Sequence, residues 1–288
     1  MTRLLRVISI VMAAVAIIAY GGASIYTKAH MDRNGPEIQM EEDEITVSVK
    51  DEAGKLLEGI TAKDKKDGDV TDSLVLESLG AFMGNGKRPV TIVAFDSDRN
   101  VAKAMRTVKY SDYISPRISM TEPLRAPVND VQKLTKGITV SDCLEGDITE
   151  NVQITPVEEG LNYNVPGEYA MKLIVSNNAG DVVELPVTIE LYDYSMDGAR
   201  PKALLLQYLV YTKVGQAIDP MAYLTGVEMR GTKYDWNTEG AVPPIDSSQV
   251  TVESGVDYQT PGVYEVCYRA DDGNGNIGCV RLIVVVEE

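Results

Sequence analysis

The sequence contains little of what several large function classes require. It has a single histidine, His30, and only three cysteines in 288 residues. A Ser-His-Asp or Cys-His site needs a histidine beside the reacting group. His30 lies shortly after an apolar N-terminal segment, and the rest of the chain supplies no histidine for such a site. Three cysteines are too few for a fold held together mainly by disulfides. We therefore expect a protein that is not an enzyme, and we assign no catalytic residue.

Positive charge is also scarce. The chain has 27 Lys and Arg against 43 Asp and Glu, which gives a formal net charge of −16. Phosphate binding needs concentrated Lys and Arg, so nucleic acid is excluded as a partner. The 15 tyrosines outnumber two phenylalanines and one tryptophan. Tyrosine suits sheets in which each ring buries its body and keeps its hydroxyl in water.

One long apolar run stands near the start of the chain. Residues 7–26 carry no charged side chain, and as a helix they would span roughly 30 Å, the thickness of a bilayer core. Arg3 and Arg6 precede the run and favour a cytoplasmic N-terminus. We expect a single-pass signal anchor in the cell membrane, partnered by the lipid bilayer, with an extracellular C-terminal body. The alternative is a secreted body, released by signal cleavage near Gly21 and Ala23.

An internal repeat organises the rest of the chain. Asp-Lys-Lys-Asp-Gly-Asp-Val-Thr at residues 64–71 returns as Asp-Cys-Leu-Glu-Gly-Asp-Ile-Thr at residues 142–149, and a Gly-Ile-Thr precedes each copy. Both features recur at one offset, 78 residues, which identifies a repeat. Three segments also open with a proline followed by a charged residue, at Pro36, Pro116 and Pro201. Units of this length match a small β-sandwich.

Alternation and turn residues indicate strands in these units. Apolar side chains recur at every second position in residues 169–175 and 264–270, so one set points inward and the other outward. Each of these strands follows a Pro-Gly pair, at Pro166 and Pro261, which is typical of a type II turn. An Asn- and Gly-rich turn and a second apolar strand come next. No convincing helical period appears after residue 26.

Together, the acidic turn, the Pro-Gly-x-Tyr sequence, the Gly-Asn turn and the last strand resemble the bacterial surface immunoglobulin-like repeats, which are also found appended to insecticidal crystal toxins. The resemblance covers essentially the whole chain after residue 35. It implies about seven strands in two sheets per unit, strung in tandem, and no catalytic residues. The third unit departs from the pattern, because residues 226–249 replace the acidic turn.

We therefore expect an all-β chain of three tandem immunoglobulin-like β-sandwiches after an N-terminal transmembrane helix. The expected parts are a cytoplasmic stub, transmembrane helix (7–26) and tether at 1–35, domain 1 at 36–112, domain 2 at 113–195 and domain 3 at 196–288. Short linkers at 110–115 and 193–199 predict a semi-rigid row with domain 3 farthest from the membrane.

The two acidic turns offer oxygen ligands for calcium, which takes six to eight of them. The candidate ligands are Asp64, Asp67 and Asp69 in the first copy, and Asp142, Glu145 and Asp147 in the second. The competing interpretation is a tight turn, with Gly68 and Gly146 at positive φ and the acids bonding to nearby amides. The turn is favoured because neither copy brings a distant bidentate acid. We expect no cofactor, with calcium left open.

Cys267 and Cys279 are placed symmetrically about Gly273. In a hairpin centred there, they would face each other on the outer side of neighbouring strands. We expect a disulfide between them if the body lies outside the cytoplasm, and two free thiols otherwise. Cys143 has no expected partner.

Tyr234, Asp235 and Trp236 lie in the long segment peculiar to the third unit. Aromatic residues on a loop of a rigid sandwich are good contacts for a protein or carbohydrate partner. The alternative is that Trp236 folds down against the core. We expect a non-enzymatic, membrane-anchored surface protein that displays its domains for adhesion or ligand binding. The alternative function is a structural accessory subunit of a cell-envelope assembly or export complex.

Overall fold

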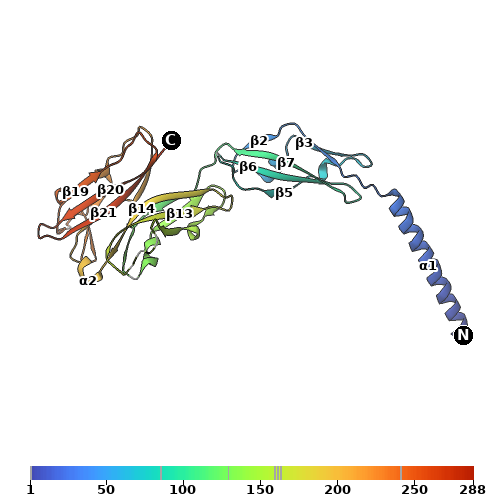
Figure 1. The fold of residues 1–288 in the computed structure, drawn as a ribbon, viewed down its shortest axis with the longest axis horizontal. Helices are drawn as coiled ribbons and strands as arrows, with labels where there is room; N and C mark the ends of the chain where they lie inside the picture. Colours follow the sequence, from blue (N-terminus) through green and yellow to red (C-terminus); the bar gives the residue numbers. More distant parts are fainter. Residues whose placement is uncertain are drawn as a thin grey trace. The chain divides into compact units, whose positions relative to one another are not determined.

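The computed structural model describes residues 2–84, 86–128, 130–158, 160, 162, 164–240 and 242–288. Helix α1 (Thr2–His30) is followed by a body built of strands (Figure 1). By its internal contacts the chain divides into two compact units, one ending at Asp112 and the other comprising Tyr113–Glu288. The first unit holds the segment expected as domain 1, and the second holds those expected as domains 2 and 3. These three names are kept for the three segments.

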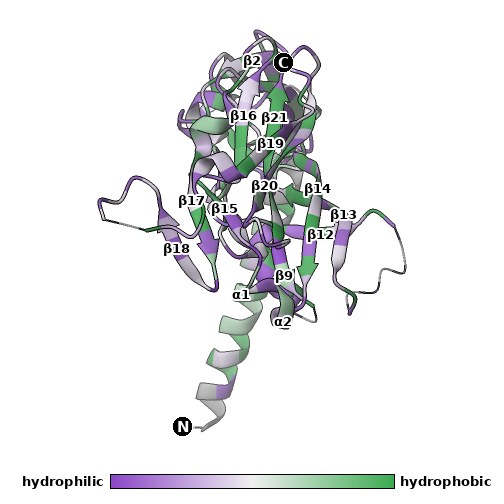
Figure 2. Cartoon of the chain, turned by 90° about the vertical axis from the view of Figure 1, so that its left-hand side faces the viewer, coloured by the Kyte–Doolittle hydropathy of each residue, from purple (hydrophilic) through white to green (hydrophobic). Residues whose placement is uncertain are grey.

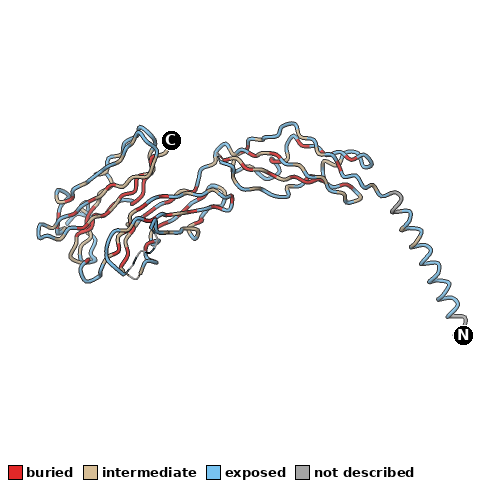
Figure 3. Tube along the Cα trace, in the orientation of Figure 1, coloured by how far each residue is buried: buried red, intermediate tan, exposed pale blue. Residues whose placement is uncertain are grey.

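Helix α1 is apolar over most of its length. Its stretch Arg6–Tyr26 has a mean hydropathy of 2.1 and none of it is buried, as the colouring by hydropathy and by burial shows (Figures 2 and 3). In the described part of the chain it is the one helix long and apolar enough to cross a membrane. A helix suits that place because it satisfies its own backbone hydrogen bonds. An N-terminal helix of this kind serves as a signal anchor or as a signal peptide.

Domain 1 is a sandwich of two sheets. The three-stranded sheet has the order β1 (Glu37–Met40), β3 (Ile60–Asp64), β4 (Gly68–Asp69). The four-stranded sheet has the order β2 (Glu44–Val47), β7 (Val101–Tyr110), β6 (Lys87–Phe95), β5 (Val75–Leu79). Apolar side chains of both sheets form a core of their own, which includes Val47, Ile60, Val90, Ile92 and Val108.

Domains 2 and 3 repeat this arrangement. In domain 2 the three-stranded sheet has the order β11 (Gly146–Asp147), β10 (Ile138–Asp142), β8 (Arg117–Met120). Its four-stranded sheet has the order β12 (Gln153–Pro156), β13 (Gly167–Ser176), β14 (Val182–Tyr192), β9 (Arg125–Pro127). In domain 3 the three-stranded sheet has the order β15 (Lys202–Leu205), β17 (Leu224–Met229), β18 (Thr232–Asp235). Its four-stranded sheet has the order β16 (Leu209–Lys213), β21 (Ile277–Glu287), β20 (Gly262–Asp271), β19 (Val250–Ser254). Short 3₁₀ helices occupy Ala53–Leu57, Thr71–Ser73, Val131–Thr135, Thr149–Asn151, Pro220–Tyr223 and Ser247–Gln249.

The seven described strands of each domain follow one plan. The second strand of each leaves the first sheet and pairs in parallel with the last strand, as β2 with β7, β9 with β14 and β16 with β21. This two-sheet plan, repeated three times, confirms the predicted all-β class. Strands β3 and β10 alternate buried and exposed residues and both end on a buried aspartate, Asp64 and Asp142. Each acidic turn therefore begins at a core-facing position.

Domain 3 replaces the acidic turn with a longer hairpin, as the sequence indicated. Strand β18 pairs with β17, and a Cβ atom added to Gly226 would lie 2.0 Å from the Tyr234 carbonyl oxygen. Only glycine permits so close an approach of two backbones. The chain then returns to the core at Ile245, which is buried. Asp246 follows and caps the 3₁₀ helix Ser247–Gln249.

Domains 2 and 3 pack side by side, so the prediction of a row is wrong for this pair. The first strand of domain 2 meets the last strand of domain 3 through Arg117 and Glu287, whose charged groups lie 2.6 Å apart. The Tyr208 amide donates to the Met120 carbonyl at 2.9 Å, and one continuous apolar cluster includes buried residues of both domains. The chain reverses at the linker that contains helix α2 (Tyr194–Asp197). A short linker permits such a reversal as readily as a straight continuation.

Candidate functional site

Each acidic turn is closed by its first aspartate. Oδ1 of Asp64 and Oδ1 of Asp142 both accept hydrogen bonds from the backbone amides two and three residues later, at 2.8–3.0 Å. Gly68 and Gly146 take positive φ values of 78° and 80°, a conformation that glycine adopts without strain. These contacts are those of the tight-turn interpretation.

The second acid of each turn reaches across to the loop after the sixth strand. Asp67 accepts hydrogen bonds from the backbone amide and the hydroxyl of Ser97, at 2.8 and 2.9 Å. Glu145 accepts at 2.6 Å from the backbone amide of Asn178 and also from its side chain. Both acids therefore fasten two loops at the same end of their sandwich.

The third acid of each turn points elsewhere. Asp69 and Asp147 accept hydrogen bonds at 3.0 Å from the backbone amides of Thr71 and Thr149. Hydrogen bonds from the threonine hydroxyl and amide lower the pKa of both carboxyl groups. Each of these acids closes an Asx turn just before a 3₁₀ helix, whose N-cap residue is Val70 in domain 1 and Ile148 in domain 2.

In domain 1 the fold brings a further acid to the first two. One carboxylate oxygen each of Asp64, Asp67 and Asp96 lies within 4.8 Å of the others. Asp96 directly follows strand β6, outside the repeated turn that supplied the calcium candidates. It was missed as a partner because only the pairing of the sheets puts the two loops at one end of the sandwich.

The Tyr234–Trp236 segment lies partly against the core. Trp236 and Tyr234 are half-buried and pack on the apolar cluster of domain 3. The Trp236 indole N–H donates to the Ile245 carbonyl at 3.0 Å. Asp235 is exposed and accepts from the Asn237 amide at 2.8 Å. Of the three contact candidates, the structure therefore leaves only Asp235 freely presented to a partner.

Cys267 and Cys279 are joined by a disulfide, with their Cα atoms 6.1 Å apart. The register is shifted by two residues from the expected one, since Cys267 lies opposite Arg281 and Cys279 opposite Arg269. The hairpin is thus centred on Asn274, and the two cysteines are diagonal rather than direct neighbours. The shift arises because the carboxylate of Asp272 accepts from both the Asn274 and Asn276 amides, which fixes the length of the turn.

A network of buried ion pairs joins domain 2 to domain 3. Arg125 of domain 2 contacts Asp197 of domain 3 at 2.6 Å and Glu190 of its own domain at 3.0 Å. Lys202 and Arg200 of domain 3 approach the same two acids at 2.7 and 3.0 Å. Burial alone would lower the pKa of Arg125, but its two carboxylate partners raise it above the usual value. Arg125 therefore stays charged at neutral pH although it is buried.

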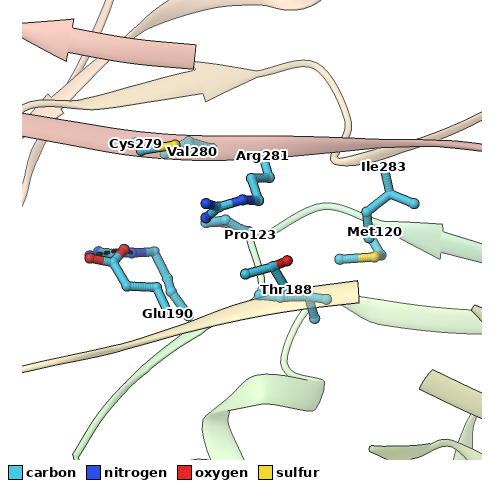
Figure 4. A pocket seen from close by; sticks show the side chains of 10 residues that line it. Met120, Pro123, Thr188, Glu190, Cys279, Val280, Arg281 and Ile283 are labelled. Carbon is cyan, nitrogen blue, oxygen red and sulfur yellow. Dashed lines mark hydrogen bonds and ion pairs between the residues drawn. The ribbon is translucent and has the colours of Figure 1, made fainter. Parts of the chain in front are cut away.

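A small cavity lies where the two domains meet. Figure 4 shows Arg281 and Ile283 of β21 facing Thr188 and Glu190 of β14 across it. Its volume is about 20 Å³, which is room for about one water molecule. This cavity is part of the packing between the domains, and it is too small for a ligand.

A larger groove lies between domains 2 and 3 on the side of the linker. Its volume is about 460 Å³, within the range of small-molecule sites. Charged side chains dominate the lining: Arg125, Lys133, Lys136, Lys202 and Lys233, with Glu122 and Glu228. Tyr192, Tyr194 and Tyr208 line it too. The basic groups outnumber the acidic ones, although the chain as a whole carries a net charge of −16.

The aromatic part of this groove is fixed by stacking. The Arg125 guanidinium lies 4.3 Å above the centre of the Tyr192 ring, a favourable cation–π geometry. Tyr194 meets Tyr192 edge-on, with ring centres 5.8 Å apart, and is itself 70% exposed. No sequence pattern indicated this site, because its lysines come from three separate segments.

Comparison with known proteins adds little to these observations. No family model and no curated protein matches the sequence. Solved structures with some likeness include the CBM51-2 and INT domains of Clostridium perfringens ZmpB, at 16% identity over 49% of this chain and 29% of that chain, with a TM-score of 0.22. The Protocadherin GammaB4 extracellular domain shows 12% identity over 88% of this chain and 49% of that chain, TM-score 0.19. Human CDH23 EC21-23 shows 14% identity over 88% and 100%, TM-score 0.20. Likeness this low carries no argument about function, and the chain spans less than half the length of the first two.

Proposed function

We propose that this chain is a non-enzymatic, membrane-anchored surface protein that binds an acidic glycan in the groove between domains 2 and 3. The observation that carries the proposal is the lining of that groove, which concentrates lysines and tyrosines in an otherwise acidic chain. The resemblance of the acidic turns to bacterial surface immunoglobulin-like repeats supports a surface role.

The chemistry of the groove suits a sugar that carries carboxylate or sulfate groups. The Lys136 ammonium is exposed and pairs with Glu122 at 3.0 Å, a contact that solvent weakens. The Lys133 ammonium is hydrogen-bonded to Asp130, which raises the pKa of Lys133, so it remains charged. An incoming anion can exchange with such surface partners at little cost. The exposed ring of Tyr194 offers a flat face on which a sugar ring can pack.

Charge reversal in the groove tests the binding proposal. We expect the full chain in detergent micelles to bind polygalacturonate and to bind its methyl ester much less, because esterification removes the carboxylates. Lys136→Glu and Lys233→Glu should each weaken polygalacturonate binding by about tenfold, since each change replaces attraction with repulsion. Binding is measured by titration at fixed low salt.

The matched control for these variants is Lys50→Glu, an exposed lysine of domain 1 with the same change of charge. It should leave the affinity within about twofold. Equal weakening by all three variants would show general charge attraction rather than a site. Absence of binding to any acidic glycan would contradict the proposal and favour the accessory-subunit role, in which partner proteins cover domain 1.

The anchor is tested separately. We expect the mature protein to keep residues 7–26 and to fractionate with membranes after alkaline extraction, because an exposed apolar stretch of 21 residues is long enough to span the bilayer core. The intact mass of the protein recovered from cells is the measurement. A mass that corresponds to a start near Gly21 or Ala23, with the body in the medium, would contradict the anchor and establish secretion.

A further inference from the structure

Domain 1 contains a buried carboxylate oxygen that has no hydrogen-bond donor. Asp64 is only 6% exposed. Its Oδ1 closes the acidic turn, but its Oδ2 is buried without a partner. Carboxylates of Asp67 and Asp96 lie beside it, within 4.8 Å. A buried polar atom without a partner is costly, and neighbouring like charges add to that cost.

Domain 2 has the same turn, but there the corresponding carboxylate oxygen has a hydrogen-bond donor. Oδ2 of Asp142, the counterpart of Asp64, accepts a hydrogen bond at 3.0 Å from the Asn177 side-chain amide. Asn177 is the first residue after β13, and Asp96 is the first residue after β6. The remaining contacts correspond, since Oδ1 of each residue accepts from the backbone amide four residues later, at 2.7 Å for Asp96 and 2.9 Å for Asn177. Domain 1 therefore places a carboxylate where domain 2 places an amide donor.

Lys66 is engaged mainly with an acid outside this cluster. Lys66 belongs to the same turn, but its ammonium pairs with Asp98. The Asn100 amide and side chain hold Asp96 at 2.7 and 2.6 Å, which fixes its carboxylate in place. Three carboxylates meet at one point, two of them are buried, and one oxygen atom of Asp64 has no donor. A bound cation would stabilise this arrangement.

We propose that domain 1 binds one calcium ion through Asp64, Asp67 and Asp96. Calcium takes oxygen ligands in flexible geometry and completes its shell with water, and Asp67 lies at the exposed side of the cluster where water has access. We expect a dissociation constant of about 10⁻⁴–10⁻³ M, the range of extracellular modules. The site is independent of the glycan groove, which lies in the other compact unit.

The experiment is calorimetric titration of the full chain in detergent micelles with calcium chloride. The wild-type chain should bind one ion. Asp96→Asn gives domain 1 the residue found in domain 2 and should remove the site. Asn177→Asp gives domain 2 the residue found in domain 1 and should create a second site with Asp142 and Glu145. Asp69→Asn removes a charge from the same turn but outside the cluster, and it should leave one site.

Melting curves recorded in the presence of a chelator distinguish a variant that has lost the calcium site from one that no longer folds. Without calcium, Asp96→Asn should melt at or above the wild-type temperature, because the new amide can donate to Oδ2 of Asp64. Calcium should raise the melting temperature of the wild type and not that of Asp96→Asn. Absence of calcium binding up to about 10 mM, a tenfold margin over the weakest expected affinity, would overturn the proposal. An unchanged number of sites in either the Asp96 or the Asn177 variant would overturn it as well.

Discussion

Replacing Arg125 with methionine should lower the free energy of unfolding of the second compact unit by about 3 kcal/mol. Removal of one partner from a buried ion pair leaves the other charge uncompensated and typically costs 3–5 kcal/mol. We expect the lower figure because each carboxylate retains a second cationic partner. Asp197 still pairs with Lys202, and Glu190 still pairs with Arg200. Methionine fills a similar volume, so the loss reports the charge rather than a cavity.

Trp236 makes the measurement simple. It is the only tryptophan of the chain, and it packs on the core of domain 3, so its fluorescence follows the unfolding of that domain in urea. The control is Arg269→Met, which removes an exposed pair with Glu253 whose charged groups lie 3.4 Å apart. That variant should change stability by no more than about 0.5 kcal/mol. An equally small change in Arg125→Met would show that the network adds nothing to stability.

The network should also make the stability of the second compact unit depend on pH in the acidic range. Burial alone would raise the pKa of Asp197, but hydrogen bonds from Arg125 and Lys202 hold it below the usual 3.8. As pH falls through this range, the unfolded chain takes up the proton first, so the stabilisation by Asp197 is present above about pH 4 and is lost below it. The stability gap between the wild type and Arg125→Met should therefore narrow as the pH falls below about 4.

The local structure of each domain could be predicted from the sequence, because local residues determine it. Period-two alternation predicted the sixth strand of domains 2 and 3, and an apolar run after the turn predicted the seventh. Gly68 and Gly146 take the positive φ expected of the acidic turns. The hairpin at Cys267 and Cys279 shows the limit of this reasoning. A symmetric spacing suggested a centre, but side-chain hydrogen bonds of Asp272 set the real one.

The sites could not be predicted, because they depend on which surfaces meet. Alternation over residues 264–270 assigned Glu265 to the outer face of its sheet, where charged residues are normally solvated. In the structure that face covers domain 2, and the Glu265 carboxylate accepts from the Thr188 backbone amide at 2.6 Å. The difference between Asp96 and Asn177 was likewise visible in the sequence. It acquired meaning only when the fold placed each residue beside its buried aspartate.

Substitution of a single leucine tests whether domains 2 and 3 unfold together. Leu173 is fully buried in domain 2, in the cluster that continues into domain 3. Leu173→Ala should cost about 2–5 kcal/mol through lost burial and the cavity that remains. Because one cluster serves both domains, we expect Trp236 in domain 3 to report this loss, although the substitution lies in the other domain.

The matched control is Ile92→Ala, which removes a fully buried side chain from the separate core of domain 1. It should destabilise domain 1 by a similar amount and leave the Trp236 transition unchanged, because contacts divide the chain at Asp112. The fluorescence of Trp236 does not report the unfolding of domain 1, which is therefore followed by circular dichroism. If Leu173→Ala left the Trp236 transition in place, domains 2 and 3 would unfold independently. The groove between them would then lie between two mobile bodies, which a preformed glycan site does not permit.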